Sequence, residues 1–304
     1  MIKKILPLCM TMLIIGLMTG ISSALNNPEI IFPEIAAIAV GSLLTPKFAW
    51  NTSKFRMLIF ICLCAVLGVL TVKFVPFPPG LRLCAAFCLA QVILLFSGTT
   101  FAPMLSAFVL PVMLGTDSPV YLISAFVLTA MILLMRLITE KISLTEPYLY
   151  QKQEPPGKVE YLAMILRMLS GSAVILAAVG LGWRFAVAPP LLVAFTEFSK
   201  PNAPAMHQKG KVIGLFALCS MTGTILRYLF LLIHAPACLA AMITILIVFI
   251  IMKKMNLFLP PAAAISILTF LIPETALLLF PVQITAGTAA LVGTAWMLNL
   301  LKKS

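Results

Sequence analysis

The polar residues best placed to bind a ligand come directly before short apolar segments. Thr99 and Thr100 precede an apolar run with Pro103 near its start, and Asn256 precedes a second run that contains Pro260. Proline is common in the first turn of a helix, where backbone N–H groups lack intrahelical partners. Such N–H groups favour negative charge, so this arrangement predicts binding of an anion at a helix N-terminus.

Three charged residues extend this predicted site. Glu197 lies in an apolar segment, where a charge is costly enough to indicate a function unless it pairs with Lys200 one turn along. Lys54 and Lys209 end two basic loops, which would either attract anions to the mouth of a cavity or only fix the topology. The predicted substrate-binding residues are Thr99, Thr100, Glu197, Asn256, Lys54 and Lys209.

Four further charged residues leave two interpretations open. Glu34, Asp117 and Glu274 are functional candidates if they lie at membrane depth, whereas a position at the interface would simply solvate them. Arg227 is expected to extend its charged head toward the interface.

The sequence lacks the motifs of common enzymes and metal sites. It has no GxxxxGK[ST] loop and no HExxH pair, and its only histidines are His207 and His234. All seven cysteines lie in apolar runs without CxxC spacing, which is typical of small buried side chains. We therefore predict that the protein is not an enzyme and uses neither a cofactor nor a metal.

The composition is that of an integral membrane protein. Of the 304 residues, 62% are hydrophobic and only 10% are charged, too few to cover a surface that faces water. The formal net charge of +12 does not indicate a nucleic-acid partner, because the basic residues lie in short loops between apolar runs. The expected partner is the lipid bilayer.

An internal repeat organises the chain. The stretch 32–56, FPEIAAIAVGSLLTPKFAWNTSKFR, matches the stretch 188–211, APPLLVAFTEFSKPNAPAMHQKGK, when Pro46 is set on Pro201. A long apolar segment follows each copy, with Gly68 facing Gly223. Such self-similarity is a strong guide to architecture. We predict two six-segment membrane repeats, at 1–139 and 161–304, joined by a hydrophilic cytoplasmic linker at 140–160.

The predicted fold is an all-α polytopic membrane protein with about twelve transmembrane or short, broken helical segments. Six segments per half is an even number, so the two repeats are parallel and related by an axis along the membrane normal. Four segments are too short to cross a hydrocarbon core about 30 Å thick. They recur at matching places, 30–45, 101–114, 185–198 and 257–272, and are expected to line a substrate path.

The distribution of basic residues gives the expected orientation. With the N-terminus in the cytoplasm, the predicted map places all but four of the 21 Lys and Arg residues on the inside, the exceptions being Lys73, Arg82, Arg184 and Arg227. That bias follows the positive-inside rule. We expect a multi-pass protein of the cell membrane with both termini in the cytoplasm.

Each half resembles the HPP family of integral membrane proteins. The resemblance lies in Val40–Pro46 through Arg56 followed by Thr99–Ala107, and in 194–211 followed by Leu257–Ala264. The family's histidine is replaced by Phe101 and Leu259, while Pro103 and Pro260-Pro261 remain. Some members are implicated in nitrite transport, so the resemblance implies a small-anion transporter. The layout of six spans, a linker and six spans is also similar to aromatic-acid exporters of the fusaric acid resistance type.

These observations favour a transporter of a small anion, nitrite-like or a small organic acid, with its path between two pseudo-symmetric halves. A non-transporting scaffold or assembly protein and an exporter of aromatic acids or drugs are the alternatives, and association with further copies of the chain is left open. A transporter predicts a polar cavity between the halves, a scaffold a solid apolar core, and an exporter a larger cavity lined by Met and Phe.

Overall fold

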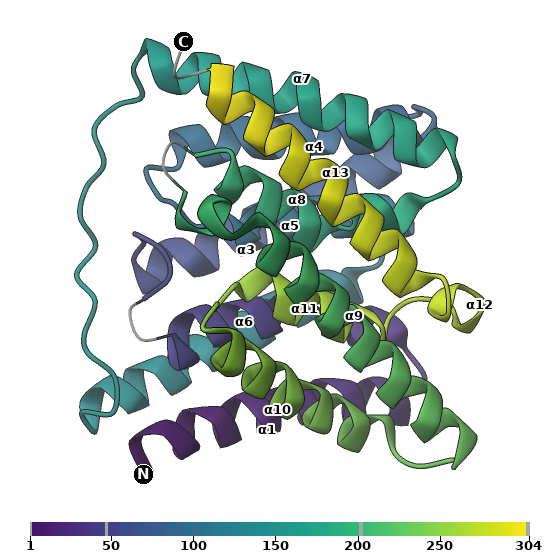
Figure 1. Cartoon of the computed structure of the whole chain (residues 1–304). Helices are drawn as coiled ribbons and strands as arrows, with labels where there is room; N and C mark the ends of the chain where they lie inside the picture. The colour runs from purple at the N-terminus through teal and green to yellow at the C-terminus, as the bar shows by residue number, and fades with distance from the viewer. Residues whose placement is uncertain (1, 46–47, 201–202, 302–304) are drawn as a thin grey trace.

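The protein is helical, as a computed structural model describes it for residues 2–45, 48–200 and 203–301 (Figure 1). Within these ranges helices and loops account for the whole fold, without a strand. Seven of the described helical segments are long and apolar enough, by length and composition, to cross a membrane. The prediction of an all-helical membrane protein is therefore confirmed at this level. These seven segments contain α1 (Ile2–Ala24), α3 (Lys54–Phe74), α4 (Pro79–Phe96), α6 (Pro119–Lys141), α7 (Lys158–Gly180), α9 (Lys209–Leu232) and α10 (Ala237–Met255), and α13 (Phe280–Leu301) is a further long helix in the described part of the chain.

Four short helices are too short to span a bilayer. The longest, α5, has 12 residues, about 18 Å at ~1.5 Å per residue. Each begins at or just after a proline, whose missing N–H costs nothing in a first turn. The short helices are α2 (Glu34–Ala39), which the π-helical turn η2 (Val40–Leu44) continues, α5 (Pro103–Leu114), α8 (Pro189–Phe198) and α11 (Pro260–Leu268). The remaining elements are η1 (Pro28–Ile30), η3 (Arg184–Val187), η4 (Pro204–Gln208) and α12 (Glu274–Leu277).

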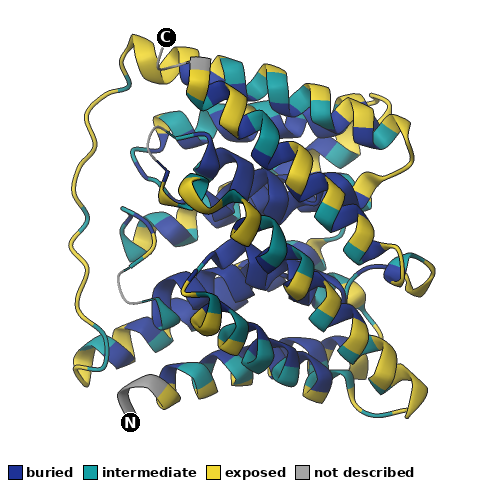
Figure 2. Cartoon of the chain, viewed as in Figure 1, coloured by how far each residue is buried: buried dark blue, intermediate teal, exposed yellow. Residues whose placement is uncertain are grey.

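The short helices form the centre of the molecule and the long helices surround them. Figure 2 shows the buried residues concentrated in this central layer, while the outer helices carry exposed side chains. Helix α2 packs against α11, and α5 packs against α8. Among the long helices, α1 packs against α10 and α4 against α7. In each of these four pairs, one helix comes from the first half of the chain and the other from the second half.

Two glycines let long helices cross short ones closely. Gly68 of α3 lies against the Phe108 carbonyl of α5, and Gly223 of α9 lies against the Ser266 carbonyl of α11. A side chain at either position would collide with that backbone, so the crossing requires glycine. A side chain of a neighbouring helix replaces one missing hydrogen bond in α5. Pro111 has no N–H to donate to the Ala107 carbonyl, and this carbonyl accepts a hydrogen bond from the Tyr121 hydroxyl of α6 instead (2.8 Å).

The connection between α6 and α7 marks one face of the protein, which we call the linker face. Figure 1 shows this connection, residues 142–157, as an extended strap on the side where α1 begins and α13 ends. The opposite side, which carries the α9–α10 turn and α12, is the far face. The strap is not simply solvated, because its tyrosines contact loops beneath it. The Tyr148 hydroxyl donates to the Asn51 side chain (2.9 Å), and the Tyr150 hydroxyl donates to the Gly98 carbonyl (2.7 Å).

We expect Asn51→Ala to loosen this strap. Besides accepting from Tyr148, the Asn51 side chain accepts from the Gln151 amide and donates to the Gln151 carbonyl, and alanine removes all three hydrogen bonds. Trypsin should then cleave after the exposed Lys152 several times faster than in the wild-type protein. Gln153→Ala, an exposed position of the same strap, is the control, and equal cleavage of the two variants would contradict a docked strap.

Candidate functional site

A small cavity lies where the four short helices meet. Its volume is about 10 Å³, close to the space that one water molecule needs. Each short helix contributes two residues that are three positions apart in its first turn, so all four helices begin at this cavity. The lining residues are Glu34 and Ala37 of α2, Pro103 and Ser106 of α5, Pro190 and Val193 of α8, and Pro261 and Ala264 of α11.

The four helices leave the cavity in two directions. Helices α2 and α8 follow segments from the far face and run toward the linker face, whereas α5 and α11 follow linker-face loops and run toward the far face. Their N-terminal ends therefore converge from both sides between the two faces. Because the N-terminus of a helix carries a partial positive charge, the cavity is a place where negative charge is favoured.

Among the described residues, Glu34 is the one ionisable side chain that lines this cavity. It is 1% exposed, and its Oε1 accepts a hydrogen bond from the Ser106 hydroxyl, which is equally buried. Its Oε2 is buried without a hydrogen-bond partner among the described residues. A buried carboxylate is costly unless it is paired or protonated, so this group stands out in an apolar core. The interfacial, solvated position that the sequence left open for Glu34 is not the one it occupies.

A polar layer lies between the cavity and the linker face. Trp50, in the loop after η2, donates its indole N–H to Glu197 Oε1 (3.0 Å) and contacts the Phe101 ring edge-on. Next to it, the fully buried Gln91 of α4 donates to the Thr196 hydroxyl of α8 (2.6 Å). These bonds join residues of the first 139 positions to α8, so they tie together the two parts of the chain.

Three of the predicted site residues lie in or beside this layer. The Thr100 hydroxyl accepts from the Asn51 amide (2.8 Å), and Thr99 is buried in the same loop, bonded to Ser97. Glu197 lies near Lys200, as the sequence suggested, and also accepts from Trp50. The hydrogen bonds of all three are made within the protein.

The other three predicted residues lie apart from that layer. Asn256 is exposed at the C-terminal end of α10, in the left-handed conformation that ends many helices (φ 51°). Lys54 forms an ion pair with Glu140 of α6, and the Lys209 ammonium lies 4.3 Å from the centre of the Trp296 ring. All six stay predicted ligand contacts, and none of them lines the central cavity as its lining is described.

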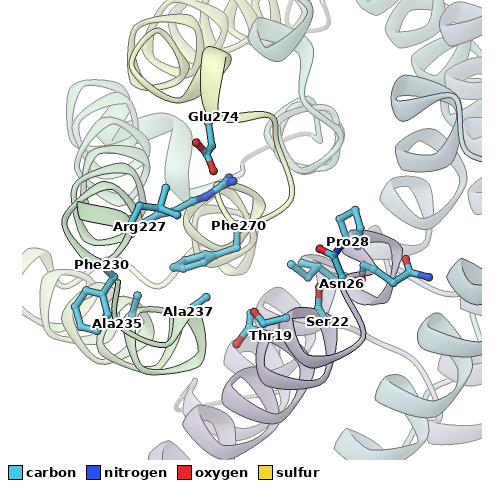
Figure 3. A pocket seen from close by; sticks show the side chains of 15 residues that line it. Thr19, Ser22, Asn26, Pro28, Arg227, Phe230, Ala235, Ala237, Phe270 and Glu274 are labelled. Carbon is cyan, nitrogen blue, oxygen red and sulfur yellow. Dashed lines mark hydrogen bonds between the residues drawn. The ribbon is translucent and has the colours of Figure 1, made fainter. Parts of the chain in front are cut away.

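A second, larger cavity opens on the far face, with a volume of about 410 Å³. The end of α1 and the start of η1 form one wall, and α9, α10 and the residues after α11 form the other (Figure 3). The Arg227 guanidinium donates to the Thr269 and Ile272 carbonyls at the end of α11, and the Glu274 side chain extends toward it. The polar part of the lining comes from Thr19, Ser22, Ser23, Asn26, Asn27, Arg227 and Glu274.

The far-face cavity and the central cavity are lined by residues that are close in the sequence. Ile31 lines the far-face cavity and lies between α1 and α2. Glu34, three residues later, is the first residue of α2 and lines the central cavity. The far-face cavity also lies along the contact of α1 with α10, one of the four pairs that join the two parts of the chain.

Comparisons with family models, with curated proteins and with solved structures found no match to this chain. The site must therefore be judged on its own geometry. Sequence reasoning left Ser106 out and did not choose Glu34 for the site. The sequence did contain a signal for Glu34, because it is an acidic residue beside Pro33 at the start of a short apolar segment. Nothing in the sequence indicates that Glu34 contacts Ser106, which lies 72 positions later.

Proposed function

We propose that the protein transports a small anion, nitrite-like or a small organic acid, across the cell membrane. In this proposal both termini and the strap are cytoplasmic, and the substrate passes between two pseudo-symmetric halves. The observation that carries the proposal is the central cavity, at which four short helices begin from both sides. Partial positive charges at these helix ends would hold an anion without a fixed cation that binds it too tightly to leave.

The arrangement of the helices supports two parallel six-segment repeats. Long and short helices follow in the same order in residues 1–139 and 161–304, with α2 and α5 in one half matching α8 and α11 in the other. The packing is reciprocal, since the first long helix of each half contacts the fourth segment of the other half, α1 with α10 and α7 with α4. A pseudo-two-fold axis between the halves would pass through the central cavity. The resemblance to HPP proteins agrees with both the repeat and the substrate class.

Uptake by reconstituted protein tests this proposal. Purified protein in liposomes should take up nitrite or formate faster than empty liposomes, and Ala264→Leu should lower that rate by about tenfold or more. The added side chain fills the central cavity, and ~1–3 kcal/mol of overpacking in a transport step corresponds to a factor between about 5 and about 150, a range that includes the expected tenfold loss. Ala290→Leu makes the same change at an exposed position of α13 and should leave uptake unchanged.

A scaffold is the second candidate, and the small size of the central cavity favours it. A core with room for about one water is close to the solid apolar core expected of a protein that does not transport. The same experiment separates the two functions. If no probe anion enters the liposomes faster than in the empty control, although the protein is folded and inserted, transport is excluded and the scaffold is favoured.

A further inference from the structure

The Glu34 carboxyl group has a feature that the transport proposal does not use. One oxygen accepts a hydrogen bond from the Ser106 hydroxyl, and the other is buried without a hydrogen-bond partner in the described part of the chain, in a residue that lines the central cavity. The side chain is in effect fully buried. An oxygen in this position can take up a proton and, when the proton leaves, carries a negative charge at the point where four helix N-termini converge.

The described surroundings of Glu34 contain no basic side chain that would hold it ionised. Helices α1, α5 and α11, which pack against α2, bring no charged group to the cavity, and neither does η2. Helix α6 brings Tyr121, and α3 brings Cys64 close to that tyrosine. Arg136 of α6 lies at the opposite end of the α2–η2 segment, where it bonds the Ser42 carbonyl and Glu140. The charge of Glu34 is therefore governed by a proton and by the helix ends.

We propose that Glu34 is the proton-carrying residue of a proton-coupled anion transporter, and that its carboxylate and the transported anion are alternative occupants of the same cavity. This inference rests on the proposed function and adds the coupling ion. With Glu34 ionised, its own negative charge faces the four positive helix ends and repels a second anion. With Glu34 protonated, the helix ends are free to accept the substrate.

The proton transfer can be written in two balanced steps. A hydronium ion that arrives from the far face gives its proton to the Glu34 carboxylate, which forms the O–H bond of the carboxylic acid and leaves a water molecule. The anion enters from the far face in the same step. On the linker face the acid returns the proton to a water molecule as the anion leaves, so one proton and one anion cross together. Ser106 positions the carboxyl group throughout, because its hydroxyl can donate to an oxygen of either form.

The test uses nitrite as the probe and protein in liposomes with an imposed pH difference. An acidic exterior should drive nitrite accumulation by the wild-type protein, and uptake should fall severalfold when the gradient is removed. Glu34→Gln imitates the protonated form, so it should still exchange nitrite for nitrite but should neither respond to pH nor accumulate nitrite. Asp117→Asn neutralises an exposed carboxylate at the end of α5 and should behave as the wild type.

The possible outcomes separate this inference from the proposed function. If the wild-type protein transports nitrite without any effect of the proton gradient, or Glu34→Gln remains proton-driven, the role of Glu34 is refuted while transport stands. If no nitrite moves at all, the proposed function fails and the coupling with it.

A spectroscopic measurement does not depend on transport rates. Infrared difference spectra of the purified protein should show the C=O band of a protonated carboxylic acid growing when nitrite is added at fixed pH, and Glu34→Gln should lack that change. Absence of the band change in a wild-type protein that binds nitrite would also refute the inference.

Discussion

Gly223→Ala is expected to destabilise the protein by about 1–3 kcal/mol, the usual range for an extra methyl group forced into a packed interior. The new Cβ would overlap the Ser266 carbonyl of α11 and lie 2.7 Å from the hydroxyl oxygen of Thr269, the residue directly after α11. A backbone carbonyl cannot rotate away as a long side chain can, so α9 and α11 would have to separate. The free energy of unfolding, measured by titrating the purified protein from mild detergent into a denaturing one, gives the change directly.

Gly214 provides a matched control in the same helix. A Cβ at Gly214 meets no atom within 4 Å, so Gly214→Ala should leave the stability unchanged or raise it by about 0.5–1 kcal/mol through the better helix propensity of alanine. Gly68→Ala should reproduce the Gly223 effect in the first half, because it would overlap the Phe108 carbonyl of α5 in the same manner. Equal stabilities for Gly223→Ala and Gly214→Ala would show that the α9–α11 crossing is looser than described.

Much of the fold could be predicted from the sequence because the membrane simplifies the problem. A backbone in lipid must satisfy its hydrogen bonds internally, so long apolar runs imply helices, and prolines near short apolar runs imply helix starts. The structure has a short helix inside each of the four predicted segments 30–45, 101–114, 185–198 and 257–272. The exact bounds differ from the predicted ones: α2 begins at Glu34 after the separate turn η1, and α11 runs from Pro260 to Leu268.

The site was harder to predict because it depends on contacts between distant residues. Periodicity cannot show that Glu34 meets Ser106 or that Trp50 reaches Glu197, which lies 147 positions away. Asn256 illustrates the opposite problem. Its position before a short helix suggested a ligand contact, but that position also suits the end of the preceding helix, and the structure shows it there, in the left-handed conformation. Local sequence alone does not distinguish these two roles.

Arginines from neighbouring long helices complete the ends of the short ones. A short helix that stops inside the protein leaves carbonyl groups without intrahelical partners. Arg227 donates to the Thr269 carbonyl directly after α11 and to the Ile272 carbonyl of the turn that follows, and Arg136 donates to the Ser42 carbonyl in η2, which continues α2. Guanidinium groups suit this task because they present several donors in a fixed plane and stay charged. Arg136 and Arg227 therefore have a structural role at the ends of two short helices.

Arg136→Met is expected to produce the second large loss of stability, about 3–5 kcal/mol, the range for removing one partner of a buried charged pair. The Arg136 side chain is 5% exposed and also donates to Glu140 (2.8 Å) and to the Glu146 carbonyl at the start of the strap. Methionine fills a similar volume but supplies no donor, so the Ser42 carbonyl loses the hydrogen bond from Arg136, and among the described residues the Glu140 carboxylate keeps Lys54 as its ion-pair partner. The detergent titration used for the glycine variants measures the loss.

Two further substitutions decide what the loss means. Arg136→Lys keeps the charge but replaces the planar set of donors with one ammonium group, which cannot reach the Ser42 carbonyl, Glu140 and Glu146 together, so it should give an intermediate loss. Lys141→Met removes an exposed charge from the last turn of the same helix and should have little effect. If Arg136→Met were as stable as Lys141→Met, the end of α2–η2 would have to be satisfied by other groups, and the role of Arg136 in holding it would be wrong.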